Sequence, residues 1–153
     1  MMKKILILTT TLLFSTIIGI SQTYDKEYTV EYINAKTSEV CKIFQEKKNI
    51  RIEFYSNGQP VRIDYIFPGT IDIEKGIYYS EDEQAIVFSC YEKAGKQIER
   101  EILKHGSKLL YDRSNLKVDC SEGECEALVT ASKHLIQLYV EKGYERTKPF
   151  EEN

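Results

Sequence analysis

The pattern of hydrophobic and polar positions changes twice along the 153 residues of this chain. The first 20 positions are mostly apolar and contain no acidic residue. The central part alternates apolar and polar side chains with the period of two that is typical of β-strands. From residue 121 onwards, apolar positions recur at helical spacing. We therefore expect a leading apolar segment, then a series of strands, then one helix.

The clearest strand signal is a β-hairpin over residues 50–67, centred on Asn57-Gly58. Both turn residues can adopt positive φ, as a two-residue type I′ turn requires. Such a turn would place three apolar pairs on one face and two ion pairs on the other. The expected pairs are Phe54 with Val61, Ile52 with Ile63, Ile50 with Tyr65, Glu53 with Arg62, Arg51 with Asp64, and Tyr55 with Pro60.

Further strands are predicted on both sides of the hairpin, joined by short polar turns. They cover residues 40–45, 76–79, 85–91, 97–103 and 108–112. Residues 25–36 fit either a strand or a helix, and we favour a short helix capped near Thr23 or Asp25.

The last periodic segment begins with a capping box, in which Ser121 is followed three residues later by Glu124. Gly143 is well placed to end this helix. Its apolar stripe consists of Leu128, Ala131, Leu135, Leu138 and Tyr139.

These elements predict an α+β fold: a mainly antiparallel, strongly bent sheet or small barrel of about six or seven strands, closed by one C-terminal helix. Pleckstrin-homology-like folds have the same order of elements, which is an analogy of architecture that carries no function. We expect a single globular domain over residues 22–144 and a polar C-terminal tail over residues 145–153.

Residues 1–21 have the basic start, apolar middle and small-residue end of a secretory signal peptide. Gly19 and Ser21 suit the two small-residue pockets of a signal peptidase, so cleavage is expected after Ser21. Cleavage leaves 132 of the 153 residues, and losing Lys3 and Lys4 changes the net charge from −3 to −5. The protein is therefore expected to be exported, to the periplasm or the extracellular space.

The apolar segment has two alternatives to a cleaved secretory signal, a membrane anchor and a lipoprotein signal. An uncleaved signal would act as a membrane anchor, and this alternative stays open. A lipoprotein would need a cysteine directly after the apolar run, but the first cysteine is Cys41. No second long apolar segment follows in the sequence, so no stable membrane span is expected after cleavage.

The composition narrows the choice of partners. No long run of one charge occurs, which argues against nucleic acid. All 11 tyrosines follow the expected cleavage site. They suit contact with proteins or sugars, although tyrosine is also an ordinary strand residue.

Four cysteines in an exported chain predict two disulfides. Cys120 precedes the helix cap and Cys125 is the fourth helical residue, and these two positions touch in a hydrophobic staple. A bridge between them is therefore expected. Cys41 and Cys90 each share a strand face with apolar residues, so they either form a second bridge or stay as buried free thiols.

The sequence holds few candidates for catalysis or metal binding. His134 is expected at the edge of the core and His105 in an exposed turn, and no catalytic Cys–His pair is expected because it would need a free thiol. The acid-rich stretch 119–126 lacks the spacing of a calcium or zinc site, so we expect no metal and no cofactor. The pairs Glu81/Glu83 and Glu99/Glu101 could mimic a glycosidase couple, but a solvated face is favoured.

Several short pieces of the chain resemble a group of small exported proteins that are typical of Bacteroidetes. The resemblance implies export and carries no established activity, so it assigns no functional residue. It rests on Tyr32-Ile33-Asn34, Asn57-Gly58 with Val61-Arg62-Ile63-Asp64, Phe88-Ser89-Cys90, His134-Leu135-Ile136-Gln137-Leu138 and Pro149-Phe150-Glu151.

The favoured function is a non-catalytic, exported module that binds a protein, a peptide or an envelope component. Two alternatives stay open: a periplasmic inhibitor or immunity-type protein, and a small hydrolase that depends on a carboxylate pair.

Overall fold

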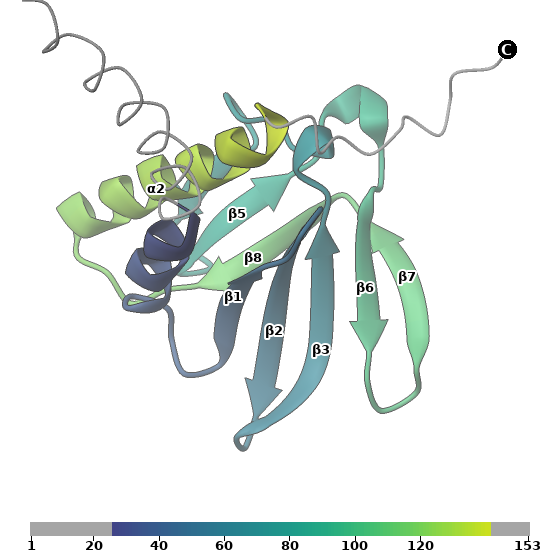
Figure 1. Ribbon diagram of the computed structural model, residues 1–153. Coiled ribbons are helices and arrows are strands. Elements are labelled where there is room, and N and C mark those ends of the chain that lie inside the picture. Colours follow the sequence, from purple (N-terminus) through teal and green to yellow (C-terminus); the bar gives the residue numbers. More distant parts are fainter. Residues whose placement is uncertain (1–25, 142–153) are drawn as a thin grey trace, which may run out of the picture.

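The computed structural model describes residues 26–141 of the protein (Figure 1). The predicted signal peptide, the predicted helix cap at Thr23 or Asp25, the predicted helix end at Gly143 and the predicted polar tail lie outside these residues. No helix within the described range is both long and apolar enough to cross a membrane.

The described strands form two antiparallel sheets. The five-stranded sheet has the order β1-β2-β3-β6-β7, made of β1 (Cys41–Gln45), β2 (Ile50–Ser56), β3 (Gln59–Ile66), β6 (Ile98–Ile102) and β7 (Ser107–Tyr111). The three-stranded sheet has the order β4-β5-β8, made of β4 (Ile77–Ser80), β5 (Ala85–Ser89) and β8 (Arg113–Lys117). The α+β class and the antiparallel pairing are thus confirmed. No closed barrel is found among residues 26–141, so the finer prediction of a strongly bent sheet or small barrel is not confirmed.

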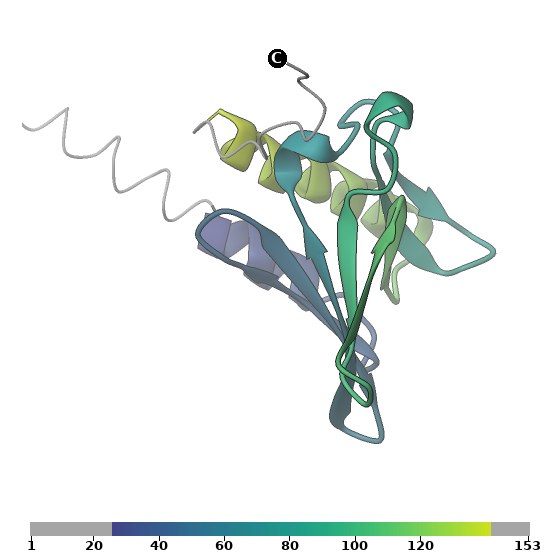
Figure 2. The same ribbon diagram turned by 90° about the vertical axis from the view of Figure 1, so that its right-hand side faces the viewer.

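Both predicted helices are present. Residues 26–34 form an N-terminal helix. Helix α2 (Glu122–Val140) begins at the predicted Ser121 cap, with the capping box in place. Figure 2 shows α2 crossing above both sheets, while the β4–β5 and β6–β7 hairpins point in different directions. Apolar side chains from the helices and both sheets form one buried core, which includes Ile33, Ile43, Ile52, Phe88, Leu128 and Leu135.

The seven predicted strands all form, but β8 was missed. In β8 only Ser114 and Leu116 are buried, and they alternate with polar residues. A serine at a buried position gives no apolar signal, so the period of two could not be recognised in this strand.

The β2–β3 hairpin turns at Asn57-Gly58, where both residues have positive φ of 51° and 74°. Tyr55 lies opposite Pro60, as predicted. Beyond this pair the predicted register is wrong, because a bulge next to Phe54 leaves Val61 without an opposite residue.

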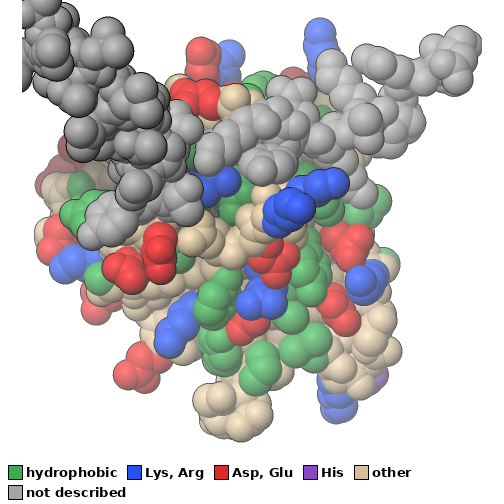
Figure 3. Space-filling view, viewed as in Figure 1, with side chains coloured by type: hydrophobic (Ala, Val, Ile, Leu, Met, Phe, Trp, Pro, Cys, Tyr) green, Lys and Arg blue, Asp and Glu red, His purple; other side chains and the backbone are tan. Residues whose placement is uncertain are grey.

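The bulge moves every remaining pair of the hairpin by one residue. The observed pairs are Phe54 with Arg62, Glu53 with Ile63, Ile52 with Asp64, Arg51 with Tyr65 and Ile50 with Ile66. Because side chains alternate between faces, Ile63 and Tyr65 lie on the outer face, and Asp64 faces the interior. Figure 3 shows apolar side chains gathered around a few charged ones over β1, β2 and β3. The hairpin therefore brings a carboxylate between the two sheets.

Candidate functional site

A pocket of about 320 Å³ lies where the two sheets diverge, and we call it the inter-sheet pocket. Phe54, Arg62, Arg100 and Tyr111 line it from the five-stranded sheet. Asp112, Arg113, Asn115 and Lys117 line it from β8 and the residue before that strand. The site thus draws on residues that are far apart in the sequence.

Two of the lining arginines, Arg62 and Arg100, are anchored on Asp64, whose side chain is fully buried. Arg62 donates to the two carboxylate oxygens at 3.0 and 2.9 Å, and Arg100 does so at 2.8 and 2.9 Å. Ser114 of the other sheet adds a hydrogen bond of 2.6 Å. Burial raises the pKa of Asp64, but the hydrogen bonds from Arg100, Arg62 and Ser114 outweigh burial and hold this pKa below its ordinary value. Asp64 is therefore an ionised anchor for two guanidinium groups.

Two aromatic rings fix the planes of these guanidinium groups. The Arg62 guanidinium lies 3.7 Å from the centre of the Phe54 ring, and that of Arg100 lies 3.9 Å from the Tyr111 ring. A guanidinium has five N–H donors, and Asp64 accepts from two of them on Arg62. The stacked arginines are thus held rigidly and keep donors for a further acceptor.

The β8 side of the pocket is organised by Glu83, at the turn between β4 and β5. Arg113 forms an ion pair with its carboxylate, and Asn115 Nδ2 donates to the same carboxylate at 2.7 Å. Lys117 donates to its backbone carbonyl. Asn115 Oδ1 is buried and has no hydrogen-bond partner among the described residues. An unsatisfied buried acceptor costs about 1–3 kcal/mol.

The charge of the pocket is opposite to that of the chain. Four of its eight lining side chains are cationic, and Asp112 is the one acid among them. With Asp64 beneath, positive charge remains in excess, whereas the whole chain carries −3. Oriented arginines over a fixed counter-ion suit a carboxylate or a phosphate, because the planar fork matches both groups.

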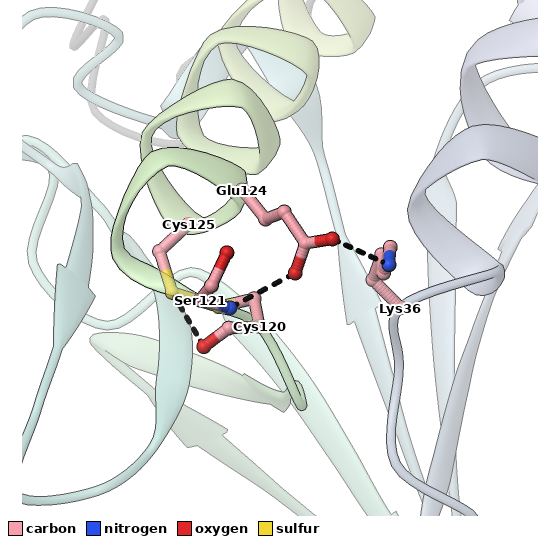
Figure 4. The surroundings of a disulfide bond; sticks show 5 residues. All are labelled: Lys36, Cys120, Ser121, Glu124 and Cys125. Atoms are coloured by element: carbon pink, nitrogen blue, oxygen red, sulfur yellow. Dashed lines mark hydrogen bonds and ion pairs between the residues drawn. A yellow bond between two sulfur atoms is a disulfide. The ribbon is translucent and has the colours of Figure 1, made fainter.

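The predicted disulfide is confirmed at the start of α2. Cys120 and Cys125 are joined by an S–S bond of 2.01 Å. Beside it, the Glu124 carboxylate accepts hydrogen bonds from the Ser121 N–H at 2.9 Å and from Lys36 at 2.8 Å (Figure 4). The hydrogen bonds from Lys36 and Ser121 lower the pKa of Glu124 to about 2. This corner thus links α2 to the segment that follows the N-terminal helix.

Cys41 and Cys90 are free thiols, so the alternative of a second disulfide is not what the structure contains. Burial raises the pKa of both thiols. The Cys41 thiol donates to the Lys117 carbonyl at 3.2 Å. Neither cysteine therefore has the lowered pKa of a nucleophile.

The other candidate residues are not brought together into a site. Glu83 is paired with Arg113 and Glu99 with Lys108, at 3.0 Å for the latter pair. His105 and His134 are both exposed, in a turn and on α2 respectively. No group of three or more His, Cys, Asp or Glu residues between 26 and 141 could hold a metal ion.

A larger, open groove of about 960 Å³ runs between β4 and the start of α2. Its charges are mixed: four glutamates and two lysines line it, next to the disulfide. None of the unsatisfied buried side-chain atoms in the described residues belongs to it. The smaller inter-sheet pocket is therefore the better candidate site, because its lining carries an excess of positive charge.

Comparison with protein-family models, curated proteins and solved structures finds no match to the chain. The interpretation of the site therefore depends on its own chemistry. Sequence reasoning named Arg62 and Asp64, but as members of exposed ion pairs. Phe54 is predicted only as a member of an apolar hairpin pair, and the remaining lining residues give no signal, since only the fold brings them together.

Proposed function

We propose that the protein is an exported, non-catalytic binding module whose inter-sheet pocket binds an anionic group of a protein, a peptide or an envelope component. The observation that carries the proposal is the pair of guanidinium groups, Arg62 and Arg100, held by buried Asp64 and stacked on aromatic rings. Their remaining donors stand beside Arg113 and Lys117.

This arrangement favours binding over catalysis. A general base needs a pKa near the working pH. Two arginines hold the pKa of Asp64 below its ordinary value, so this carboxylate is too weak a base for that role. Glu83, the carboxylate behind the β8 side, is engaged by Arg113 and Asn115. A small carboxylate-dependent hydrolase is thus the weaker alternative. An inhibitor or immunity-type protein would be a special case of the same binding.

The test is isothermal titration calorimetry of the protein with succinate and, separately, with inorganic phosphate. We expect both anions to bind, and binding to weaken as salt screens the charges. Arg113→Gln should weaken it about tenfold, since a charge-assisted hydrogen bond contributes about 1.5–3 kcal/mol. Lys75→Gln, an exposed lysine of the open groove, is the matched control and should change nothing. Equal affinity of Arg113→Gln and the unchanged protein would refute the pocket as the site.

The export part of the proposal has a separate test. The full chain, expressed in a bacterium with a periplasm, should be recovered from the periplasm or the medium. N-terminal sequencing should begin at Gln22. Recovery with residues 1–21 intact in the membrane fraction would instead support the anchor.

A further inference from the structure

The two edges of the five-stranded sheet differ in how their backbone groups are hydrogen-bonded. At the β1 edge, the Asn34 side chain accepts from the Ile43 N–H at 2.9 Å and donates to the Ile43 carbonyl at 2.7 Å. This one side chain therefore replaces a neighbouring strand at the middle of β1. At the other edge, β7 pairs only with β6 among the described strands. Figure 1 shows β7 at the side of the molecule that is away from α2.

The free edge of β7 offers a defined set of backbone groups. The Leu103 N–H, just after β6, donates to the Val61 carbonyl on the β3 side. Because orientation alternates along a strand, the backbone groups of Ile98, Arg100 and Ile102 face β7. Their partners on β7 are Tyr111, Leu109 and Ser107. The N–H and C=O groups of the residues between these partners, Lys108 and Leu110, therefore point away from the sheet.

The side chains of β7 do not protect this edge. The side chains of Leu109 and Leu110 are 56% and 48% exposed. An exposed apolar edge strand tends to pair with strands of other chains, and proteins usually block such pairing. Lysine is a common guard at such edges. Here, however, Lys108 forms a 3.0 Å ion pair with Glu99 on β6, so its charge is neutralised. An edge with free backbone groups, exposed leucines and no active guard is suited to receiving a strand.

We propose that the β7 edge binds an extended segment of a partner protein as a sixth strand, and that an acidic side chain of this segment enters the inter-sheet pocket. Tyr111, the last residue of β7, lines that pocket, and Arg113 follows two residues later. Leu109, Tyr111 and Arg100 share the inner face of the sheet, so alternate side chains of an added strand project toward the cationic side chains. The acidic preference rests on the function proposed above, whereas the strand addition does not.

Charge complementarity favours a partner segment over a second copy of this chain. The sequence of β7 is Ser-Lys-Leu-Leu-Tyr, which contains no acid. A second β7 would place Ser107, Leu109 and Tyr111 on the inner face, and none of these side chains supplies a negative charge to the cationic pocket. The occupant is therefore an extended peptide with apolar residues and at least one Asp or Glu.

The test is selection of binders from a displayed library of random peptides, followed by amide hydrogen exchange of the protein with the enriched peptides. We expect protection of the Lys108 and Leu110 amides. Leu110→Pro removes an outward N–H without removing a bond to β6, so it should fold and bind more than about tenfold more weakly. Leu110→Val keeps the N–H and should bind normally. Circular dichroism of the variants verifies folding, and the exchange measurement needs no variant.

Each result of this experiment supports or overturns a stated part of the proposal. No enrichment, enriched peptides that protect other amides, or equal affinity of Leu110→Pro and Leu110→Val would overturn the strand addition. A dimer in sedimentation that Leu110→Pro dissociates would assign the edge to a second copy and overturn the peptide. Peptides that add to β7 with equal affinity in Arg113→Gln, and without acidic residues, would support the strand addition and refute the anion pocket.

Discussion

Asp64 and Ser114 lie in different sheets, 50 residues apart in the sequence, and share a hydrogen bond of 2.6 Å. The same carboxylate binds Arg100 on β6, 36 residues away. One buried side chain therefore ties together β3, β6 and β8. The fold at the pocket is held by this polar contact as well as by apolar packing.

Replacing Asp64 should strongly destabilise the fold. Asp64→Asn leaves two guanidinium groups without their counter-ion, and breaking a buried ion pair costs about 3–5 kcal/mol. Urea denaturation measures this loss as a lower free energy of unfolding. Asp82→Asn, in the exposed turn between β4 and β5, is the control and should stay within about 0.5 kcal/mol of the unchanged protein.

The same residue predicts an acid transition. The pKa of Asp64 is lower in the folded protein than in the unfolded chain, so its contribution is complete above the unfolded value, about 3.9. The contribution is lost as the pH falls from there through the folded pKa. The free energy of unfolding should therefore fall more steeply below about pH 4 in the unchanged protein than in Asp64→Asn. Parallel profiles would contradict this role.

The bulged register predicts the outcome of a charge exchange. Arg62→Glu places an acid beside buried Asp64 and should cost about 3 kcal/mol or more. Adding Glu53→Arg should not restore stability, because Glu53 lies opposite Ile63 and pairs with Arg51. A double-mutant cycle measures this coupling. Recovery of more than about 1 kcal/mol in the double variant would instead support the register without a bulge.

Chemical mapping should distinguish one disulfide-bonded pair of cysteines from two free thiols. Non-reducing peptide mapping should give one bridge, Cys120–Cys125, and two thiols that react only after unfolding, because Cys41 is buried and Cys90 partly so. Cys120→Ser with Cys125→Ser should lower the free energy of unfolding by about 2 kcal/mol, since the closed loop is short. A reducing agent should destabilise the unchanged protein and leave the double variant unaffected. A Cys41–Cys90 cross-link would contradict the structure.

Asn34 should stabilise the β1 edge by its two hydrogen bonds to Ile43. Asn34→Ala should cost about 2 kcal/mol, at roughly 1 kcal/mol for each bond, and the Ile43 amide should exchange faster. Asn34→Asp keeps the acceptor for the Ile43 N–H but loses the donor to the Ile43 carbonyl. The Ile43 amide should therefore exchange more slowly in Asn34→Asp than in Asn34→Ala. Unchanged exchange in Asn34→Ala would show that the edge is closed by other groups.

Local signals in the sequence predicted most of the elements but not how they combine. Asn57-Gly58 located the hairpin because the turn chemistry is local. The register failed because it was chosen to pair apolar side chains, and the chain instead buries Asp64. That burial is compensated by Arg100 and Ser114, which no local pattern connects to it.

The disulfide and the candidate site show the same contrast. Cys120 and Cys125 are five residues apart, so the expected export and the local geometry of the helix start predicted their bond. The pocket needs Arg62, Arg100 and Arg113 on three strands, and these strands meet only through long-range pairing. Sequence reasoning therefore recognised features made by neighbouring residues and missed the feature made by the meeting of two sheets.

The bulge beside the Asn57-Gly58 turn also gives the chain a way to reject a misassembled hairpin. In the unshifted register, Asp64 would face outward, and Arg100 and Ser114 would meet no carboxylate when the sheets dock. Closing the two sheets over such a hairpin would bury the charge of Arg100 without its partner, so that assembly is strongly disfavoured. Only the bulged hairpin fits the second sheet. We therefore expect the register of the hairpin and the docking of the second sheet to be coupled through this one ionised side chain.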